Sequence, residues 1–244
     1  GGSGVTFANA AKNYTLWGFG KISGTTKLTK QGAGNLTIDT TNDYTGVTSI
    51  NGGKLYVSLL TNGGIASSIG AADADDANIV LNGGTLSYTG ANVSIDRGIT
   101  ISAANSGIST DNSLAFSGDV SSTGGSLVKD GAGNLTLTGP SVSIGGSGQV
   151  NKITGGTMTF DGLGSQSVSI PGELWIGCVP DSSGNLVLND TTLNVGSWIT
   201  LGRGTGNTGV TSALTATNST LQCNQLSTGF DGDLGYNNAT QLIT

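Results

Sequence analysis

Short runs of alternating apolar and polar residues recur along the whole chain. In each run the apolar residues stand two positions apart, as expected for a β-strand with one buried face. Thr, Asn, Ser or Val fills the positions between them. The clearest pairs are Leu36 and Ile38, Leu135 and Leu137, Leu186 and Leu188, and Leu193 and Val195. No run has the period of a helix, so the pattern predicts an all-β protein.

The runs belong to repeated phrases. "KQGAGNLTIDT" at 30–40 returns as "KDGAGNLTLTG" at 129–139, which places Gly34 and Gly133 99 residues apart. A shorter copy, "GNLVL", follows at 184–188, and "LWIG" at 174–177 is followed by "ITLG" at 199–202. These intervals predict a structural unit of about 25 residues, with "AADADDA" at 71–77 as an insertion.

A unit of about 25 residues, made of short strands joined by Gly/Asn turns, is typical of one coil of a single-stranded right-handed parallel β-helix. We therefore expect one continuous β-helix over residues 1–244, with roughly nine to ten coils. Because strands of adjacent coils lie about 4.8 Å apart, the rod would be about 45 Å long.

The repeated phrase also predicts the corners of the coils. Gly can adopt positive φ without a steric penalty, and Asn tolerates the left-handed region and bonds backbone groups at turns. We expect these roles for Gly32, Gly34, Asn35, Gly131, Gly133 and Asn134.

Composition excludes several functions. Glycine accounts for 43 of 244 residues, charged residues for only 10%, and the net charge is −6. The nine Lys and Arg residues do not cluster, so we expect no nucleic-acid partner. No apolar run approaches the roughly 20 residues of a membrane span, so we expect no membrane insertion by this segment. Nothing in the sequence indicates a cofactor.

Residues 27–58 resemble the passenger-associated repeat of bacterial autotransporters. The shared pattern is a Lys-x-Gly-x-Gly-x-Leu-x-Leu run, an Asn-x-Tyr-x-Gly turn and a final Gly-Gly-x-Leu. It is matched by Lys30, Gly32, Gly34, Leu36, Ile38, Asn42, Tyr44, Gly46, Gly52, Gly53 and Leu55. A second copy at 126–160 has "PSVSIGGSGQV" in place of the turn, and 174–229 resembles looser repeats. The resemblance implies a β-helical stalk, secreted or on the bacterial surface, and no chemistry.

Acidic side chains offer few candidate sites. Asp73, Asp75 and Asp76 form the densest cluster. They are weak candidates for Ca²⁺ ligands, but their spacing is not that of a Ca²⁺ loop. We expect a solvated loop there and no metal. Asp231 and Asp233 have the same interpretation.

Catalysis by the commonest general base is excluded because the chain contains no histidine. Arg97 and Arg203 remain as candidate bases of a β-helical polysaccharide lyase or hydrolase. A solubilising charge beside a turn is the simpler interpretation of both, and we expect no enzyme.

Outward aromatic residues are the best candidates for binding. Alternation places Tyr56, Trp175 and Trp198 on the outer surface, where aromatic rings can stack on sugars or anchor a protein. Loops or a neighbouring module covering them would be the alternative.

The two cysteines are predicted to be separate buried thiols. Cys223 aligns with the inward Val195 of the preceding coil. Cys178 lies about two coils before Cys223, beyond the reach of a disulfide.

We expect a non-enzymatic structural or adhesive β-helix, extracellular or on the bacterial surface. Since a β-helix exposes unpaired strand edges at its ends, we expect the ends to meet neighbouring domains of a longer chain or identical subunits head to tail. The alternatives are an adhesin module that binds surface glycans or host proteins, and the polysaccharide-degrading enzyme.

Overall fold

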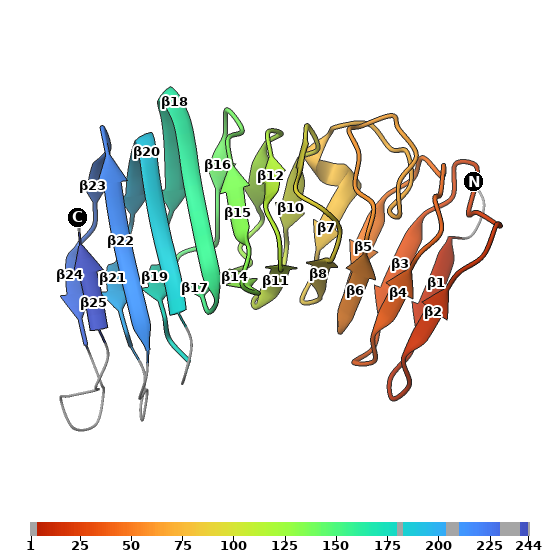
Figure 1. Cartoon of the computed structure of the whole chain (residues 1–244), viewed down its shortest axis with the longest axis horizontal. Coiled ribbons are helices and arrows are strands. Elements are labelled where there is room, and N and C mark those ends of the chain that lie inside the picture. The colour runs from red at the N-terminus through yellow and green to blue at the C-terminus, as the bar shows by residue number, and fades with distance from the viewer. Residues whose placement is uncertain (1–3, 180–182, 204–209, 230–239, 244) are drawn as a thin grey trace.

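The computed structural model describes residues 4–179, 183–203, 210–229 and 240–243. Its strands lie across a rod and pair in parallel with strands one coil away (Figure 1). The protein is an all-β parallel β-helix of about nine turns, as the alternation and the repeats predict. One 3₁₀ turn, Asp76–Asn78, is the only helical element among the described residues.

The coils have three faces, here called A, B and C. Face A contains β1 (Val5–Ala8), β3 (Leu28–Gln31), β5 (Thr48–Ile50), β7 (Ile79–Leu81), β10 (Ile99–Ile101), β13 (Val120–Ser122), β16 (Val142–Ser143), the later parts of β18 (Gly156–Ile170) and β20 (Ser183–Val195), and β23 (Thr220–Gln222).

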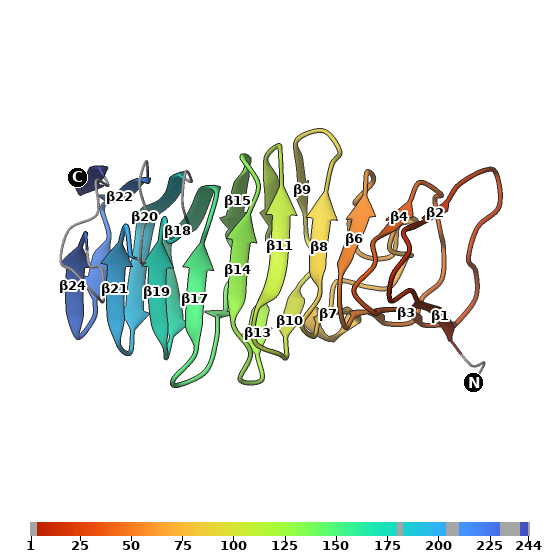
Figure 2. The same cartoon turned by 90° about the horizontal axis from the view of Figure 1, so that it is seen from below.

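Face B is a separate sheet whose ten strands follow one another along the rod (Figure 2). It contains β2 (Tyr14–Leu16), β4 (Leu36–Ile38), β6 (Lys54–Val57), β8 (Thr85–Tyr88), β11 (Ser106–Thr110), β14 (Leu127–Asp130), β17 (Val150–Ile153), β19 (Glu173–Ile176), β21 (Trp198–Leu201) and β24 (Gln225–Thr228).

Face C begins only at the fourth coil. It contains β9 (Val93–Ile95), β12 (Leu114–Phe116), β15 (Asn134–Leu137), the early parts of β18 and β20, β22 (Thr211–Thr217) and β25 (Thr240–Ile243). In the first three coils, segments without strand structure stand in its place. Strands β18 and β20 each run from face C into face A, and their pairing therefore joins the two faces into one sheet.

The inward positions of all three faces form one apolar core. The pairs predicted from alternation, such as Leu36 with Ile38 and Leu193 with Val195, are all buried. In-register pairing stacks them on inward residues of the next coil, as Leu36 stacks on Leu55 and then Leu86. Each such side chain is removed from water by its neighbours above and below, so the hydrophobic effect acts along the whole rod.

Coil length varies more than the repeats suggest. On face B, Leu36 is in register with Leu55, and Leu55 with Leu86, so the second of these coils is more than half as long again as the first. The predicted unit of about 25 residues is therefore too long for the first of these coils, although the pairing of Trp175 with Thr200 has the predicted spacing. The long coil contains the insertion that the sequence indicated, between β6 and β7.

The two copies of the repeated phrase occupy different faces. In the first copy, Gly34 lies at the corner from face A (β3) to face B (β4). In the second, Gly133 lies at the corner from face B (β14) to face C (β15). The interval between the copies is thus four coils and one further face, because the phrase encodes a type of corner and not a fixed side of the rod.

The glycines of the phrase have two different roles. Gly32 and Gly131 adopt positive φ (82° and 79°), as predicted. Gly34 and Gly133 do not, so that part of the prediction is wrong. A Cβ at Gly133 would overlap the Asn112 carbonyl oxygen of the preceding coil, and one at Gly34 would meet the same kind of obstacle. Close backbone approach therefore requires glycine there.

The asparagines of the phrase also differ from expectation. Neither Asn35 nor Asn134 is among the residues with positive φ. Asn134 instead bonds along and between coils: its Nδ2 donates to Thr136 Oγ1 (3.1 Å), and its Oδ1 accepts from Thr159 Oγ1 (3.0 Å). The backbone carbonyl of Asn35 accepts from Asn9 Nδ2 (2.8 Å).

Each copy of the phrase also buries its lysine. Lys129 Nζ donates to three backbone carbonyls, those of Asp130 (2.8 Å), Gly131 (3.0 Å) and, one coil further on, Gly155 (3.0 Å). The whole residue is inaccessible to solvent, and burial lowers the pKa of the ammonium group to about 8. We call this arrangement a lysine cage.

The first copy repeats the cage. Lys30 Nζ donates to the carbonyls of Gln31 (3.2 Å), Gly32 (2.8 Å) and Gly52 (2.9 Å), and Lys30 is also fully buried. Burial likewise lowers its pKa. Each lysine therefore links two parts of the repeat, because it bonds the first glycine of a Gly-Gly pair in the next coil. These glycines are Gly52, which precedes Gly53, and Gly155, which precedes Gly156.

Candidate functional site

Two tryptophans lie on the outer surface of face B near the C-terminal end of the rod. Trp175 in β19 and Trp198 in β21 both have partly exposed side chains beside buried inward residues. Their strands are adjacent, with Leu174 paired to Ile199, so the indoles lie on neighbouring coils. The predicted outward direction of both residues is confirmed.

An arginine lies between the two rings. The Arg203 guanidinium carbon is 4.2 Å from the centroid of the Trp175 ring and 5.8 Å from that of Trp198. Arg203 Nη1 also donates to Glu173 Oε2 (2.9 Å), which accepts a second bond from Trp175 Nε1 (2.6 Å). One carboxylate therefore orients both the guanidinium and the indole.

A second cation completes the cluster. Lys152 in β17 is paired with Trp175, and its Nζ lies 5.5 Å from the centroid of that ring. Both cations gain from the negative face of the indole. We call Lys152, Glu173, Trp175, Trp198 and Arg203 the tryptophan platform.

A buried hydroxyl lies beside the platform. Thr200 is paired with Trp175 across adjacent coils, at an outward position of β21, yet it is fully covered. Its Oγ1 has no hydrogen-bond partner among the described residues. Buried hydroxyls ordinarily have a partner, so Thr200 is an exception, with Asn9 Oδ1 and Asp43 Oδ1, among the buried polar atoms of the described residues.

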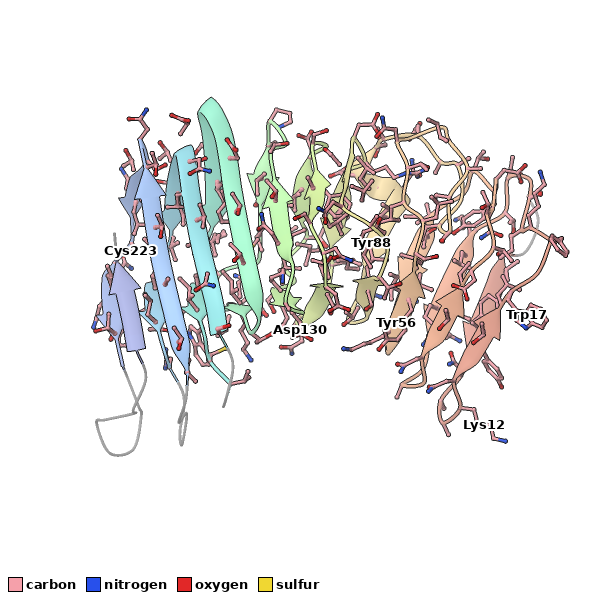
Figure 3. The ribbon with its side chains drawn as sticks, viewed as in Figure 1. Lys12, Trp17, Tyr56, Tyr88, Asp130 and Cys223 are labelled. Carbon is pink, nitrogen blue, oxygen red and sulfur yellow. The ribbon has the colours of Figure 1, made fainter. Side chains whose placement is uncertain are left out.

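Tyr56, the third aromatic candidate, also points outward but lies elsewhere. It belongs to β6, and four further strands of face B separate β6 from β19. Figure 3 shows Tyr56 in the N-terminal half of the rod. The structure thus brings together two of the three predicted aromatics.

The acidic candidates have local structural contacts. Asp75 accepts from Ala77 N (2.9 Å) and caps the 3₁₀ turn, while Asp73 accepts from Asn78 Nδ2 and from Asp75 N. No group of three or more His, Cys, Asp or Glu side chains with metal-binding geometry occurs in the described part of the chain. Asp231 and Asp233 lie outside the described residues.

Arg97 is not the solubilising surface charge that the sequence suggested. It is 1% exposed, and its guanidinium donates to the carbonyls of Thr61 (2.8 Å), Asn62 (3.2 Å), Ile65 (3.1 Å) and Gly70 (3.1 Å). It therefore fastens the insertion between β6 and β7 to the rod. A guanidinium bound to four carbonyls is not placed to act as a base.

The cysteines are separate, as predicted, but less buried than expected. Neither Cys178 nor Cys223 forms a disulfide, and both are partly exposed. Cys223 packs against the core, one residue beyond the paired Asn194 and Gln222, which confirms its alignment with Val195. Burial raises the pKa of both thiols, so neither is activated as a nucleophile.

Both ends of the rod expose inward positions. Tyr14 is in register with the buried Leu36, yet 51% of its surface is exposed, and Trp17 beyond it is 78% exposed. At the other end, Leu226 is in register with the buried Ile199 but is 40% exposed. The apolar core thus reaches the end surfaces, and Trp17, at an outward position, lies at the N-terminal end as well (Figure 3).

The fold and these surfaces define a rod-shaped β-helix with a solid core, and comparison with known proteins assigns its repeats. Residues 28–57 and 127–160 match the passenger-associated-transport-repeat family. The chain is therefore a parallel β-helix, and two of its segments are similar to passenger-associated transport repeats. The match includes both lysine cages.

A curated relative is similar over most of this chain. The adhesin BmaC autotransporter of Brucella suis biovar 1 (strain 1330) is 38% identical over 204 residues, which cover 76% of this chain. The chain spans only 6% of the length of that relative. No solved structure matches. Among the described residues, no helix is long and apolar enough to cross a membrane.

The sequence predictions do not assign three members of the platform to a binding site. Arg203 is predicted only as a base or a solubilising charge, and neither Lys152 nor Glu173 is among the candidates. Alignment of "NKITG" with "LWIG" one coil later is the signal that places Lys152 next to Trp175. No comparable signal exists for Arg203, because it follows the end of β21 and its side chain turns back over the sheet.

Proposed function

We propose that this chain is a stiff, non-enzymatic β-helical segment of a bacterial surface adhesin, exported as part of an autotransporter passenger. The observation that carries the proposal is the unbroken strand pairing along the rod, combined with the two passenger-associated repeats. Parallel coils joined at every step by backbone hydrogen bonds and apolar contacts resist bending, as a stalk requires.

The open ends support a segment within a longer rod. Tyr14 and Leu226 occupy core positions at the two ends and remain exposed. A further coil stacked on either end would bury them and would pair the open strand edges. Neighbouring coils of a longer chain are the occupants we propose, and identical subunits head to tail are the alternative.

Surface display tests the proposal. The chain is fused to an autotransporter translocator in a non-adherent bacterium, and the same translocator without the chain is the control. We expect a trypsin-resistant folded core on the cell surface and increased attachment to host cell layers. Digestion of the displayed chain to small peptides would contradict the rod, and attachment equal to the control would contradict the adhesin.

Electron microscopy of the purified chain distinguishes the two proposals for what covers its ends, neighbouring coils of a longer chain or identical subunits. Negatively stained rods of about 45 Å at every concentration are expected for a passenger segment, given ten strands about 4.8 Å apart. Rods that lengthen with concentration would instead identify a fibre subunit.

A further inference from the structure

We propose that a groove at the corner between faces A and B, near the C-terminal end of the rod, is a binding site for neutral saccharides. Its volume of about 350 Å³ lies within the range of sites for small ligands and suits a mono- or disaccharide. The proposal rests on the proposed function only for its setting at the cell surface. We call this site the corner groove.

Equivalent positions of three successive coils form one side of the corner groove. Ser169 in β18 is in register with Asn194 in β20, and Asn194 is in register with Gln222 in β23. All three side chains stand at outward positions of face A and line the groove. The groove therefore runs along the side of the rod. A further coil stacked on the C-terminal end would adjoin it without filling it.

The corners that follow these strands form the other side. Pro171, Gly196 and Asn224 lie at successive corners between face A and face B, and all three line the groove. A Cβ at Gly196 would lie 2.4 Å from the Pro171 carbonyl oxygen, so these two corners pack closely on each other. Asn224 Nδ2 donates to the Gly196 carbonyl (3.0 Å), which orients this amide before a ligand binds.

Carboxamides supply polar groups that are free to bind a ligand. In the part of the chain that the structure describes, the Gln222 side chain makes no hydrogen bond, and Asn194 makes one long bond, from Nδ2 to Ser167 Oγ (3.3 Å). A carboxamide has two donors and an acceptor oxygen with two lone pairs, so most of this capacity is unused. A sugar hydroxyl also both donates and accepts, and it therefore matches these groups.

Apolar atoms are available for the C–H groups of a sugar ring. Val195 and Cys223, which occupy equivalent positions in adjacent coils, line the groove together with Pro171. Figure 3 shows Cys223 near the C-terminal end of the rod. Small-ligand sites commonly combine such apolar contacts with a few polar groups that fix orientation.

The charges in and around the groove favour a neutral ligand. Among the described residues that line it there is no Asp, Glu, Lys or Arg, and the net charge of the chain is −6. A carboxylate or phosphate would leave water without gaining a cation as a partner, which is costly. A neutral ligand rich in hydroxyl groups has no such cost.

The test uses immobilised neutral oligosaccharides of glucose, galactose, mannose and N-acetylglucosamine, with uronic-acid oligosaccharides as the charged comparison. The purified whole chain is applied to both sets. We expect it to bind a member of the neutral set at least about tenfold more tightly than any uronic-acid oligosaccharide, because the groove offers a charge no partner. Binding to no neutral oligosaccharide, or equal or tighter binding to the acidic set, would overturn the proposal.

Variants then locate the site. Asn194→Ala and Gln222→Ala are each expected to weaken binding of the preferred neutral oligosaccharide about fivefold, because each removes hydrogen bonds to the ligand. Gln31→Ala is the matched control, since Gln31 is an exposed glutamine at the end of β3, before the equivalent corner of an early coil. Circular dichroism and the urea midpoint establish that each variant is folded. Unchanged binding in both groove variants would overturn the assignment.

Alkylation of the cysteines provides a readout that needs no substitution. Cys223 lines the groove and Cys178 does not, and both thiols are partly exposed. At a saccharide concentration about ten times its Kd, alkylation of Cys223 by iodoacetamide should slow about tenfold, while Cys178 serves as the internal control. Equal rates for Cys223 with and without the saccharide would overturn the location. Failure here would leave the surface rod intact, because surface display tests that separately.

Discussion

Replacing Lys129 by methionine would measure what a lysine cage contributes to the rod. Methionine keeps most of the length and the apolar stem but has no donor, so three partly buried carbonyls lose the ammonium as a partner. Each such carbonyl costs about 1–3 kcal/mol, and removing the buried charge returns several kcal/mol. We expect the free energy of unfolding to fall by about 3 kcal/mol.

Urea unfolding followed by circular dichroism measures this loss, with the slope of the transition compared between variants. Lys27→Met is the matched control, because Lys27 is exposed and makes none of the cage contacts. A surface substitution of this kind changes stability by no more than about 0.5 kcal/mol. Lys30→Met, in the second cage, should behave like Lys129→Met. A cage variant as stable as the control would refute the reasoning.

Three further predictions follow from buried groups. Burial lowers the pKa of Lys129 from an ordinary 10.5 to about 8. Between these two pH values the unfolded chain therefore holds a proton that the folded chain has lost. The stability of the wild type relative to Lys129→Met, measured in urea titrations, should thus rise as pH increases across this interval. Gly133→Ala should lower the urea midpoint strongly, because the new Cβ would overlap the Asn112 carbonyl. Gly20→Ala should leave the midpoint unchanged, because the space around Gly20 is open. Equal midpoints for the two variants would contradict the close backbone approach at Gly133. Arg97→Met should expose the insertion between β6 and β7 to limited proteolysis while the rod stays intact, and an unchanged cleavage pattern would show that the insertion holds without the arginine.

The general fold was predictable because its determinants are local. Alternation, as in Leu36 and Ile38, specifies which side of a strand is buried. Because the strands stack in parallel and in register, the same side is buried in every coil. The outward direction of Trp175 and Trp198 follows from the same rule. Neither inference requires knowledge of distant contacts.

The site depended on contacts that the alternation does not contain. Arg203 lies beyond the end of β21, and only the path of its side chain brings it over Trp175. Arg97 resembles a surface charge in the sequence because nothing local shows that four carbonyls of an insertion surround it. In both cases a long side chain bonds residues that are distant in the sequence, as Arg97 does with Gly70 and Arg203 with Glu173.

The lysine cages explain why the repeat can move from one face of the rod to another. Lys30 and Lys129 each bond two carbonyls of the turn that follows them and one carbonyl of the glycine pair in the next coil. All partners belong to one corner and to the corner stacked on it, so the motif is complete wherever two successive corners share its shape. A sequence repeat in this β-helix therefore marks a stacked pair of corners. The number of residues between two copies depends on how many faces, as well as how many coils, separate them.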